Sequence, residues 1–342
     1  MSVRTRRHAA ISLVCALTAG SALLLTACDT AGTTAAPAPS SPAPSSAAPS
    51  TAATTPSAAP SAPAVSASVS PVNKTANTGL TISNGTNLVV VNGDTVDFHT
   101  VVRDLAWSPD GSRAAFVDGS GNLVVSRPDG SASSVVAKNP GGQTWSHPTW
   151  QVVGPHDGLP ANNNIFFTIA ASGTTHLATV PADTAGSVPT DLRLGSYSDN
   201  DAPVLPTAGN TWINGSDRQG TTVYANTAEG DVYIRDDYLR QQGKVLTKGS
   251  QPALSTDGES VVFVRSVDGH DHIFTQGTQA RQGQAPKDLT PNATTDYTEP
   301  AWSRDGKTIA VRTPNGVATL PADGSAAPEL VSSVAGLPAY RG

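Results

Sequence analysis

Cysteine is almost absent from this chain of 342 residues. Its two cysteines, Cys15 and Cys28, both lie within the first 28 residues. The remainder of the chain therefore has no thiol that forms a disulfide, attacks a substrate or binds a metal. Any folded domain must be held together by packing and backbone hydrogen bonds.

Charged and aromatic side chains are also scarce. Charged residues make up 14% of the chain and aromatic residues 5%, whereas there are 31 glycines and 27 prolines. Coiled coils and helical bundles need periodic stretches rich in Ala, Glu, Lys and Leu, so this composition favours a turn-rich, all-β chain. The formal net charge is −6, and no Lys/Arg cluster follows residue 7. We therefore expect no binding to nucleic acid.

The first 28 residues follow the order of a bacterial export signal. A basic start at Arg4 to Arg7 precedes an uncharged stretch over residues 9–27. The stretch ends in Leu-Thr-Ala-Cys, which resembles the lipobox of bacterial lipoproteins. The resemblance implies that residues 1–27 are a signal peptide and that Cys28 is lipidated, which would anchor the protein to a membrane. An uncleaved transmembrane segment is the alternative, and the Arg6-Arg7 pair leaves twin-arginine export open.

A stretch of small and polar residues follows this signal. Of the 47 residues from 29 to 75, 40 are Ala, Pro, Ser or Thr. Such a stretch has too few large apolar side chains to offset the entropy lost on ordering. We therefore predict that residues 28–78 form a lipidated cysteine followed by a disordered tether, and that residues 79–342 form the folded domain.

A short pattern recurs through residues 79–342. An anchor residue is followed by Ser-x-Asp-Gly and then by a short apolar run, most clearly after Trp107, Leu254 and Trp302. Weaker copies have their anchors at Trp150 and Leu205, and a half-copy ends at Tyr340. Neighbouring anchors are 38 to 55 residues apart, a period typical of one four-stranded propeller blade.

Each copy has the chemistry of a β-hairpin. In Ser108-Pro109-Asp110-Gly111, proline presets φ, the aspartate bonds back to the backbone and glycine adopts a positive φ. Six blades fit the copies if the half-copy at 337–340 supplies the innermost strand of a blade whose other strands lie within residues 80–99. We therefore predict a six-bladed β-propeller closed by pairing of N- and C-terminal strands, which leaves no long sheet edge exposed. A β-sandwich of the same strands is the alternative, but it would not explain the repeat.

The recurring pattern resembles the PD40, or WD40-like, repeat of TolB-type β-propellers. The resemblance covers nearly all of residues 79–342 and is strongest around Trp107 and Trp302. It implies a role as a protein-binding scaffold or accessory subunit in the bacterial cell envelope. LpqB-type lipoproteins likewise combine a lipid anchor with a propeller. In this chain residues 29–75 take the place of the N-terminal domain that each of these families carries.

The first candidate site is the position just before each innermost strand, where residues of all blades ring the mouth of the central channel. Five polar residues are predicted there: Asp104, His147, Asp201, Gln251 and Glu299. Three of them are acidic, so the mouth suits a cation, an amine or a basic loop of a partner. A solvated opening without a ligand is the alternative.

The second candidate site comprises two enlarged hairpins, at residues 154–163 and 206–220, predicted on the face opposite the mouth. Loops on a rigid scaffold often carry recognition, and tryptophan is a favoured anchor. The candidate contacts are His156, Leu159, Trp212 and Ile213. The alternative is a pair of surface insertions with Trp212 packed on its own blade.

Catalytic patterns are not found in the sequence. There is no Gly-x-Ser-x-Gly motif of a hydrolase, and the one histidine cluster, His270-Asp271-His272, flanks a predicted turn, which favours exposed side chains. We therefore expect a monomeric, non-enzymatic propeller with no cofactor and no metal, on the extracytoplasmic face of the cell membrane, that binds another envelope protein. The alternative function is the binding of a small ligand, glycan or cation, or a lactonase-like activity, at the acidic mouth.

Overall fold

The computed structural model describes residues 71–155, 161–196, 204–215, 220–236, 242–279 and 284–342. Within these ranges all regular secondary structure is β-strand, which confirms the predicted all-β class. None of the described residues forms a helix long and apolar enough to cross a membrane.

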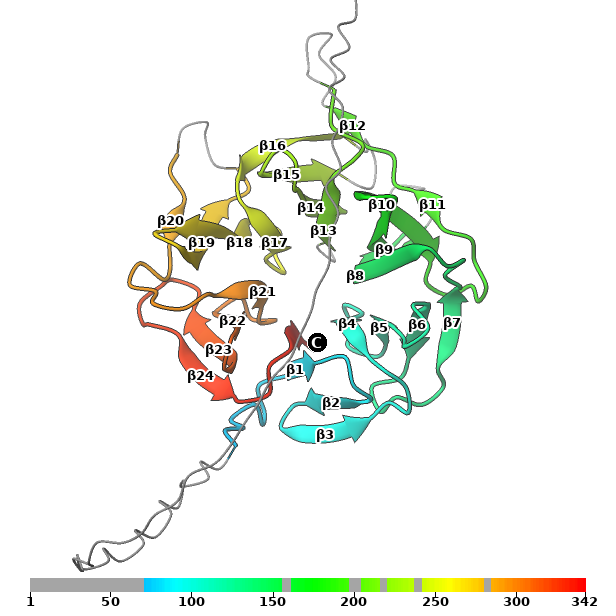
Figure 1. Ribbon diagram of the computed structural model, residues 1–342, viewed down its shortest axis with the longest axis horizontal. Helices are drawn as coiled ribbons and strands as arrows, with labels where there is room; N and C mark the ends of the chain where they lie inside the picture. Colours follow the sequence, from blue (N-terminus) through cyan, green and yellow to red (C-terminus); the bar gives the residue numbers. More distant parts are fainter. Residues whose placement is uncertain (1–70, 156–160, 197–203, 216–219, 237–241, 280–283) are drawn as a thin grey trace, which may run out of the picture. The chain divides into compact units, whose positions relative to one another are not determined.

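Six sheets surround a central axis as the blades of a propeller (Figure 1). From the axis outward, blade 1 consists of β25 (Leu337–Tyr340), β1 (Leu80–Ser83), β2 (Leu88–Val91) and β3 (Asp94–Asp97). Blade 2 consists of β4 (Arg103–Trp107), β5 (Ala114–Val117), β6 (Leu123–Ser126) and β7 (Ser134–Ala137). Blade 3 consists of β8 (Gln143–Val153), β9 (Asn162–Ala171), β10 (Thr174–Pro181) and β11 (Thr190–Asp191).

The second half of the ring follows the same plan. Blade 4 consists of β13 (Asn210–Gly215), β14 (Thr221–Asn226), β15 (Asp231–Asp236) and β16 (Gln242–Lys248), with β12 (Gly195–Ser196) parallel to β16 at its outer edge. Blade 5 consists of β17 (Ser250–Leu254), β18 (Ser260–Val267), β19 (His270–Gly277) and β20 (Lys287–Asp288). Blade 6 consists of β21 (Thr298–Trp302), β22 (Thr308–Thr313), β23 (Gly316–Pro321) and β24 (Glu329–Ser332).

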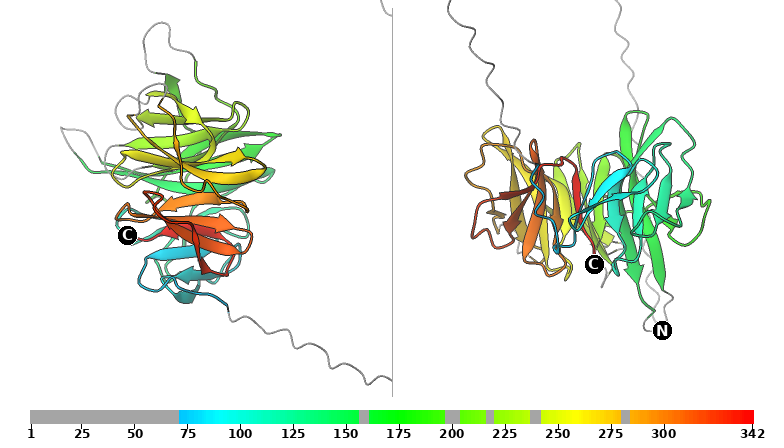
Figure 2. Two further views of the ribbon diagram at one scale, coloured as in Figure 1. Left: turned by 90° about the vertical axis from the view of Figure 1, so that its left-hand side faces the viewer. Right: turned by 90° about the horizontal axis from the view of Figure 1, so that it is seen from below.

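Blade 1 closes the ring by joining strands from opposite ends of the propeller sequence. The last strand, β25, pairs antiparallel with β1 over the full length of both, from Leu80 opposite Tyr340 to Ser83 opposite Leu337. The edge-on views show this blade standing in the ring like the others (Figure 2). The predicted six-bladed ring and its closure are therefore confirmed.

The hydrophobic core is divided into six clusters, and each cluster lies between two neighbouring blades. Between blades 1 and 2, for example, Val89 and Phe98 pack against Leu105 and Phe116. The other five clusters fill the remaining five interfaces in the same way. Each blade is therefore buried on both faces, which explains why all four residues of β5 and of β6 are buried.

The recurring Ser-x-Asp-Gly turns are fixed by the same side-chain bonds in three blades. Ser108 Oγ donates to Asp110 Oδ1 at 2.6 Å and accepts the backbone N–H of Arg113 at 3.0 Å. The bond from Ser108 and those from the backbone N–H and hydroxyl of Ser112 lower the pKa of Asp110 to about 2, because they favour the carboxylate. The corresponding serine–aspartate bonds lie at Ser255–Asp257 and Ser303–Asp305. The repeat is therefore a hairpin signature, as the sequence indicates.

The inner strand of blade 4 differs from the sequence-based prediction. The copy around Leu205 was expected to begin this blade, but Leu205 lies before the inner strand, which is β13. Leu205 is instead buried against Phe166 and Tyr224, between blades 3 and 4. The mistake arises because Ala-Pro-Val-Leu at 202–205 imitates the repeat, whereas β13 has neither its proline nor a tryptophan at its end.

The propeller contacts begin before residue 79, where the sequence analysis placed the start of the domain. The N-terminal strap, as we name residues 72–75, lies along the outermost strand of blade 6. Lys74 N–H donates to the Val331 carbonyl at 2.7 Å, and Ser333 N–H donates to the Val72 carbonyl at 2.9 Å. Thr75 is fully buried. The strap thus ties the start of blade 1 to the edge of blade 6.

Removal of the N-terminal strap is expected to destabilise the propeller. A shortened variant that starts at residue 77 loses the two backbone hydrogen bonds to blade 6 and the burial of Thr75, so it should unfold about 1–3 kcal/mol more easily than one that starts at residue 71. Thermal unfolding followed by circular dichroism measures the difference. Lys74→Ala is the control, because its ion pair with Glu329 is exposed and should contribute little. Equal melting temperatures of the two shortened variants would show that the strap adds nothing to closure.

Candidate functional site

The inner strands of five blades share an unusual backbone device. Each contains a β-bulge, marked by a register shift against the second strand of its blade. The first residue of each bulge has a φ between 50° and 55°, in the left-handed region: Asp104, His147, Trp212, Gln251 and Glu299. Non-glycine residues adopt this conformation at a cost on the order of 1 kcal/mol each, and bulges re-aim side chains. Five equivalent outliers at one place mark the hub as the candidate site.

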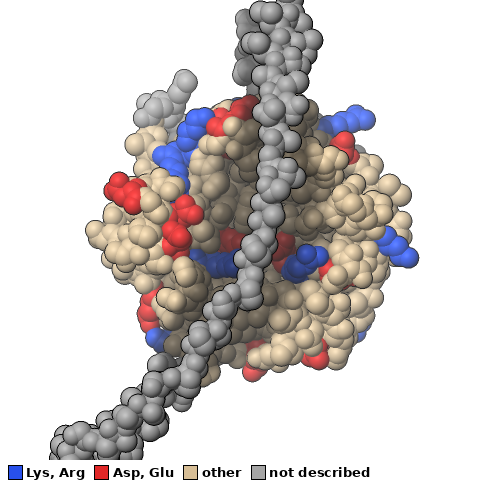
Figure 3. Space-filling view, viewed as in Figure 1, with Lys and Arg blue, Asp and Glu red and all other residues tan. Residues whose placement is uncertain are grey.

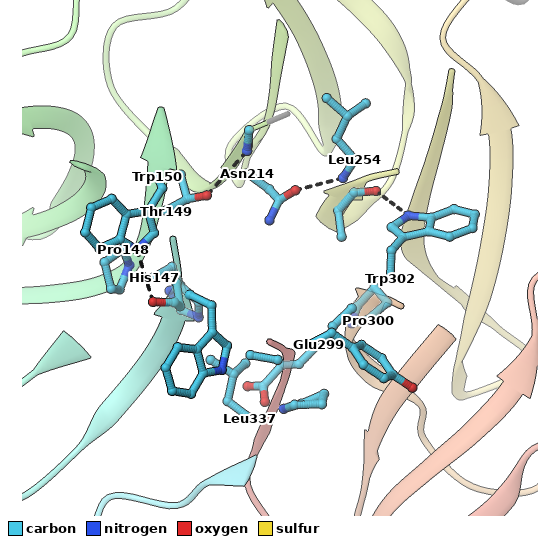
Figure 4. A pocket seen from close by; sticks show the side chains of 18 of the residues that line it. His147, Pro148, Thr149, Trp150, Asn214, Leu254, Glu299, Pro300, Trp302 and Leu337 are labelled. Carbon is cyan, nitrogen blue, oxygen red and sulfur yellow. Dashed lines mark hydrogen bonds between the residues drawn. The ribbon is translucent and has the colours of Figure 1, made fainter. Parts of the chain in front are cut away.

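These five residues and Leu337 of β25 form the mouth ring. They line one cavity of about 210 Å³ at the centre of the propeller. Figure 4 shows the labelled side chains of His147, Asn214, Glu299 and Leu337, which come from four blades, arranged around its open centre. The residues that follow the mouth ring along the inner strands are apolar: Leu105, Pro148, Ile213, Pro252, Pro300 and Pro338.

Hydrogen bonds from the repeat tryptophans connect neighbouring blades along the wall of the cavity. Trp150 Nε1 donates to the Ala106 carbonyl of the preceding blade at 3.1 Å. Trp302 Nε1 donates to the Ala253 carbonyl at 3.0 Å, and Trp107 Nε1 donates to Thr81 Oγ1 at 3.0 Å. In blade 4, which lacks this tryptophan, the Asn214 side chain accepts Leu254 N–H at 2.8 Å (Figure 4). The hub is therefore a fixed frame for the mouth ring.

Hydrogen bonds also connect neighbouring blades at two places in the mouth ring. Asp104 Oδ2 accepts the backbone N–H of His147 at 3.1 Å, and Gln251 Oε1 accepts the backbone N–H of Glu299 at 2.7 Å. In both pairs the side chain of one blade holds the bulge of another. Acceptor side chains at the ring thus have a structural use in addition to any contact with a ligand.

Charges at the mouth ring are only partly balanced. The carboxylate of Glu299 lies 3.2 Å and 3.3 Å from Arg312 Nη1. Burial raises the pKa of Glu299, the Asp104 charge raises it further, and Arg312 opposes both. On the face drawn in Figure 3, acidic and basic side chains lie next to one another at the centre of the ring. The two ring carboxylates therefore repel each other across the opening.

An aromatic pair forms the other side of the mouth ring. The rings of His147 and Trp212 are 3.6 Å apart between centroids, at an interplanar angle of 39°. Burial lowers the pKa of His147, against the opposing charge of Asp104, which favours a neutral imidazole. His147 Nδ1 is buried without a hydrogen-bond partner among the described residues. Trp212 is only partly buried, so its indole is available to a ligand.

The structure brings four of the five residues predicted for the mouth together, namely Asp104, His147, Gln251 and Glu299. The fifth, Asp201, lies outside the described residues. Trp212 occupies the ring position of blade 4, where an acidic residue was expected. The mouth therefore has fewer acidic groups among its described residues than predicted, and an aromatic one instead.

The prediction of a second site on the opposite face is wrong for Trp212 and Ile213. Both lie in β13 and line the hub cavity, because the inner strand of blade 4 begins later than its sequence pattern suggests. His156 and Leu159, and also Cys28, lie outside the described residues. The short apolar run Val-Tyr-Ala within the next strand, Thr221–Asn226, is a signal that identifies β13 as the preceding strand of a hairpin.

The histidine cluster in blade 5 is not the exposed turn that the sequence favours. His272 is buried, and its Nδ1 lies 2.9 Å from Asp288 Oδ2. His270 lies 3.3 Å from Asp296. Nowhere in the described part of the chain do three His, Cys, Asp or Glu side chains gather in a group that could hold a metal ion.

Comparisons with known proteins agree with the fold. Residues 78–205 match the family described as Lipoprotein LpqB beta-propeller domain. Curated protein sequences yield no match. TolB from Acinetobacter baumannii is similar in structure, with a TM-score of 0.51 and 16% identity over 77% of this chain and 65% of that chain. A chain of a nidogen/laminin complex has a TM-score of 0.51 and 11% identity, over 77% of this chain and 97% of that chain.

The similarities cover part of the chain, or have low sequence identity. The family match covers residues 78–205, less than half of the chain, and the identities to solved structures are low. This chain spans just under two thirds of the Acinetobacter protein. What the comparisons establish is a β-propeller fold similar to that of TolB.

Replacement of Glu299 by glutamine is expected to change how stability depends on pH. Because the folded-state pKa of Glu299 lies above its ordinary value of 4.5, the ionised group destabilises the fold. The contribution of Glu299 to the free energy of unfolding is most favourable below pH 4.5. This benefit is lost as the pH rises through the folded-state pKa of the group. Glu299→Gln should therefore melt at a higher temperature than the parent at about pH 7.5, and lose that advantage at about pH 4. Melting curves at both pH values measure this.

The matched control for Glu299→Gln is Glu259→Gln, which removes an exposed carboxylate from the β17–β18 turn at the other end of the inner strand. It should follow the parent at both pH values. A Glu299→Gln variant that melts at a lower temperature than the parent at about pH 7.5 would show that the Arg312 ion pair outweighs burial and repulsion.

Proposed function

We propose that this protein is a lipid-anchored propeller of the bacterial cell envelope that binds another envelope protein at its mouth ring. The observation that carries the proposal is the set of five left-handed bulge residues that meet at one cavity. Backbone strain repeated at one place is typical of a ligand site, where the surrounding structure holds side chains in a fixed arrangement. The hydrogen bonds between neighbouring blades hold the ring residues in such an arrangement.

The anchoring part of the proposal rests on Cys28 and on the match to a lipoprotein domain. A lipid on Cys28 would hold the protein at the outer face of the cytoplasmic membrane. The protein-binding part follows from the resemblance to TolB-type propellers, which implies a scaffold or accessory role. Both parts place the propeller beside other envelope proteins.

A binding role is favoured over catalysis by the arrangement of the mouth ring. The carboxylate of Asp104 accepts the backbone N–H of His147, whereas the imidazole of His147 faces Trp212. The ring therefore does not use its histidine and aspartate as a paired acid and base. A metal-based alternative also has less support, because Glu299 is already paired with Arg312 and Trp212 stands at the fourth blade.

The proposal is tested by photo-crosslinking the full-length protein in intact cells and isolating its adducts. Trp212→Ala removes the partly exposed aromatic residue of the mouth ring and should reduce the main adduct by tenfold or more, as loss of a central aromatic contact at ~2 kcal/mol would. Leu337→Arg should reduce it as well, because it adds bulk and charge to the ring. Cys28→Ala should abolish incorporation of labelled fatty acid, and either release the mature protein from the membrane fraction or leave its precursor unprocessed.

The control for these variants is Val188→Ala, which alters an 81% exposed side chain between β10 and β11, the two outer strands of blade 3. It should leave the adduct unchanged, and all variants are compared at temperatures at which their melting curves show folded protein. An adduct that survives both mouth-ring substitutions contradicts binding at the mouth. A Cys28→Ala variant that incorporates labelled fatty acid as strongly as the parent contradicts the lipid anchor.

A further inference from the structure

We infer that the group which the mouth ring receives from its partner is a basic side chain, lysine or arginine, held between Asp104, Glu299 and the indole of Trp212. This inference rests on the proposed function and names the chemistry of the partner at the same site. It follows from the charge of the mouth ring, the aromatic surface of the ring and the size of the hub cavity.

The charge at the mouth ring favours a cation. The ring contains two carboxylates and no lysine or arginine. The counter-ion of Glu299 among the described residues is Arg312, whose side chain is 47% exposed, so the pairing is weakened by solvent. Arg103, which precedes Asp104, donates instead to the Asp118 carbonyl at 3.1 Å. Since the Asp104 charge raises the pKa of Glu299, a cation between them would relieve a repulsion present in the free protein.

The aromatic surface of the mouth ring favours an organic cation over a metal ion. Trp212 offers the aromatic ring that binds ammonium and guanidinium groups most strongly. Its neighbour His147 is favoured in the neutral form by burial and so does not repel such a group. A metal ion needs several hard ligands, and the described residues offer no group of three that could hold one.

The depth of the hub cavity limits what enters it. A volume of about 210 Å³ suits one side chain, not a folded element. Beyond the mouth ring the cavity is lined by apolar and uncharged polar side chains, and the charged side chain among the described residues that line it there, Arg304, would repel a cation that moved deeper. The cation is therefore expected to stop at the level of the ring carboxylates. The formal net charge of −6 would assist the approach of a basic partner.

The test uses the propeller labelled with fluorotryptophan and two small probes, N-acetyl-arginine amide and N-acetyl-citrulline amide. The two probes have nearly the same shape, but only arginine is charged. The chain has five tryptophans, so Trp212→Phe assigns the Trp212 signal in the fluorine NMR spectrum. We expect a saturable shift of that signal with the arginine probe, with a Kd on the order of millimolar. The citrulline probe should bind at least tenfold more weakly.

Substitutions at the mouth ring complete the test. Asp104→Asn combined with Glu299→Gln should weaken binding of the arginine probe by tenfold or more, and Glu259→Gln on the far side of the hub should leave it unchanged. If the double variant does not fold, Glu299→Gln alone is used, since its amide still accepts a hydrogen bond from Arg312. Equal binding of the two probes, no saturable shift at about 50 mM, or an unchanged Kd in the folded ring variant each overturns the inference.

The outcomes separate this inference from the proposed function. If the arginine probe fails to bind but the cellular adduct still depends on Trp212, the mouth ring binds a partner of different chemistry. If the probe binds but the adduct does not depend on Trp212, the mouth ring accepts a basic group and the proposed function fails.

Discussion

The whole structure depends on closure of the ring. Each of the six core clusters lies between two blades, so a blade is buried only when both of its neighbours are present. The last interface can form only if β25 pairs with β1 in a shared blade. The N-terminal strap adds a second link, from the start of blade 1 to the edge of blade 6. With no disulfide available beyond residue 28, these pairings must hold the ring together.

Closure also creates the functional site. It brings six inner strands together, and the bulge in five of them turns one side chain of each toward the mouth. Hydrogen bonds such as that from Trp150 to Ala106 tie neighbouring inner strands, so the position of each ring residue is fixed by the blades beside it. This arrangement holds two carboxylates, a histidine whose pKa is lowered by burial and a partly exposed tryptophan at fixed positions before any ligand arrives. Such preorganisation lowers the entropy that binding must overcome.

The sequence predicted the hairpins and the shared blade, which depend on local turn chemistry and on the repeat. It did not predict the inner strand of blade 4 or the bulges, which depend on pairing within the assembled ring. Turn residues such as Asp110 and the repeat tryptophans identify the hairpins, and the half-copy ending at Tyr340 indicates the shared blade. Blade 4 was misplaced because Leu205 completes an imitation of the repeat, and Trp212 was therefore assigned to the wrong face. The left-handed bulges could not be predicted either, because they come from pairing between strands and not from glycine.

The central claim is that the partner binds at the mouth of the hub. It is tested most directly by placing a photo-crosslinking amino acid, benzoylphenylalanine, at Leu337 of the mouth ring or at Glu259 on the opposite side of the propeller, in the full-length protein in intact cells. The account predicts a specific adduct from position 337 and none from position 259. An adduct from position 259 with none from position 337 would contradict it.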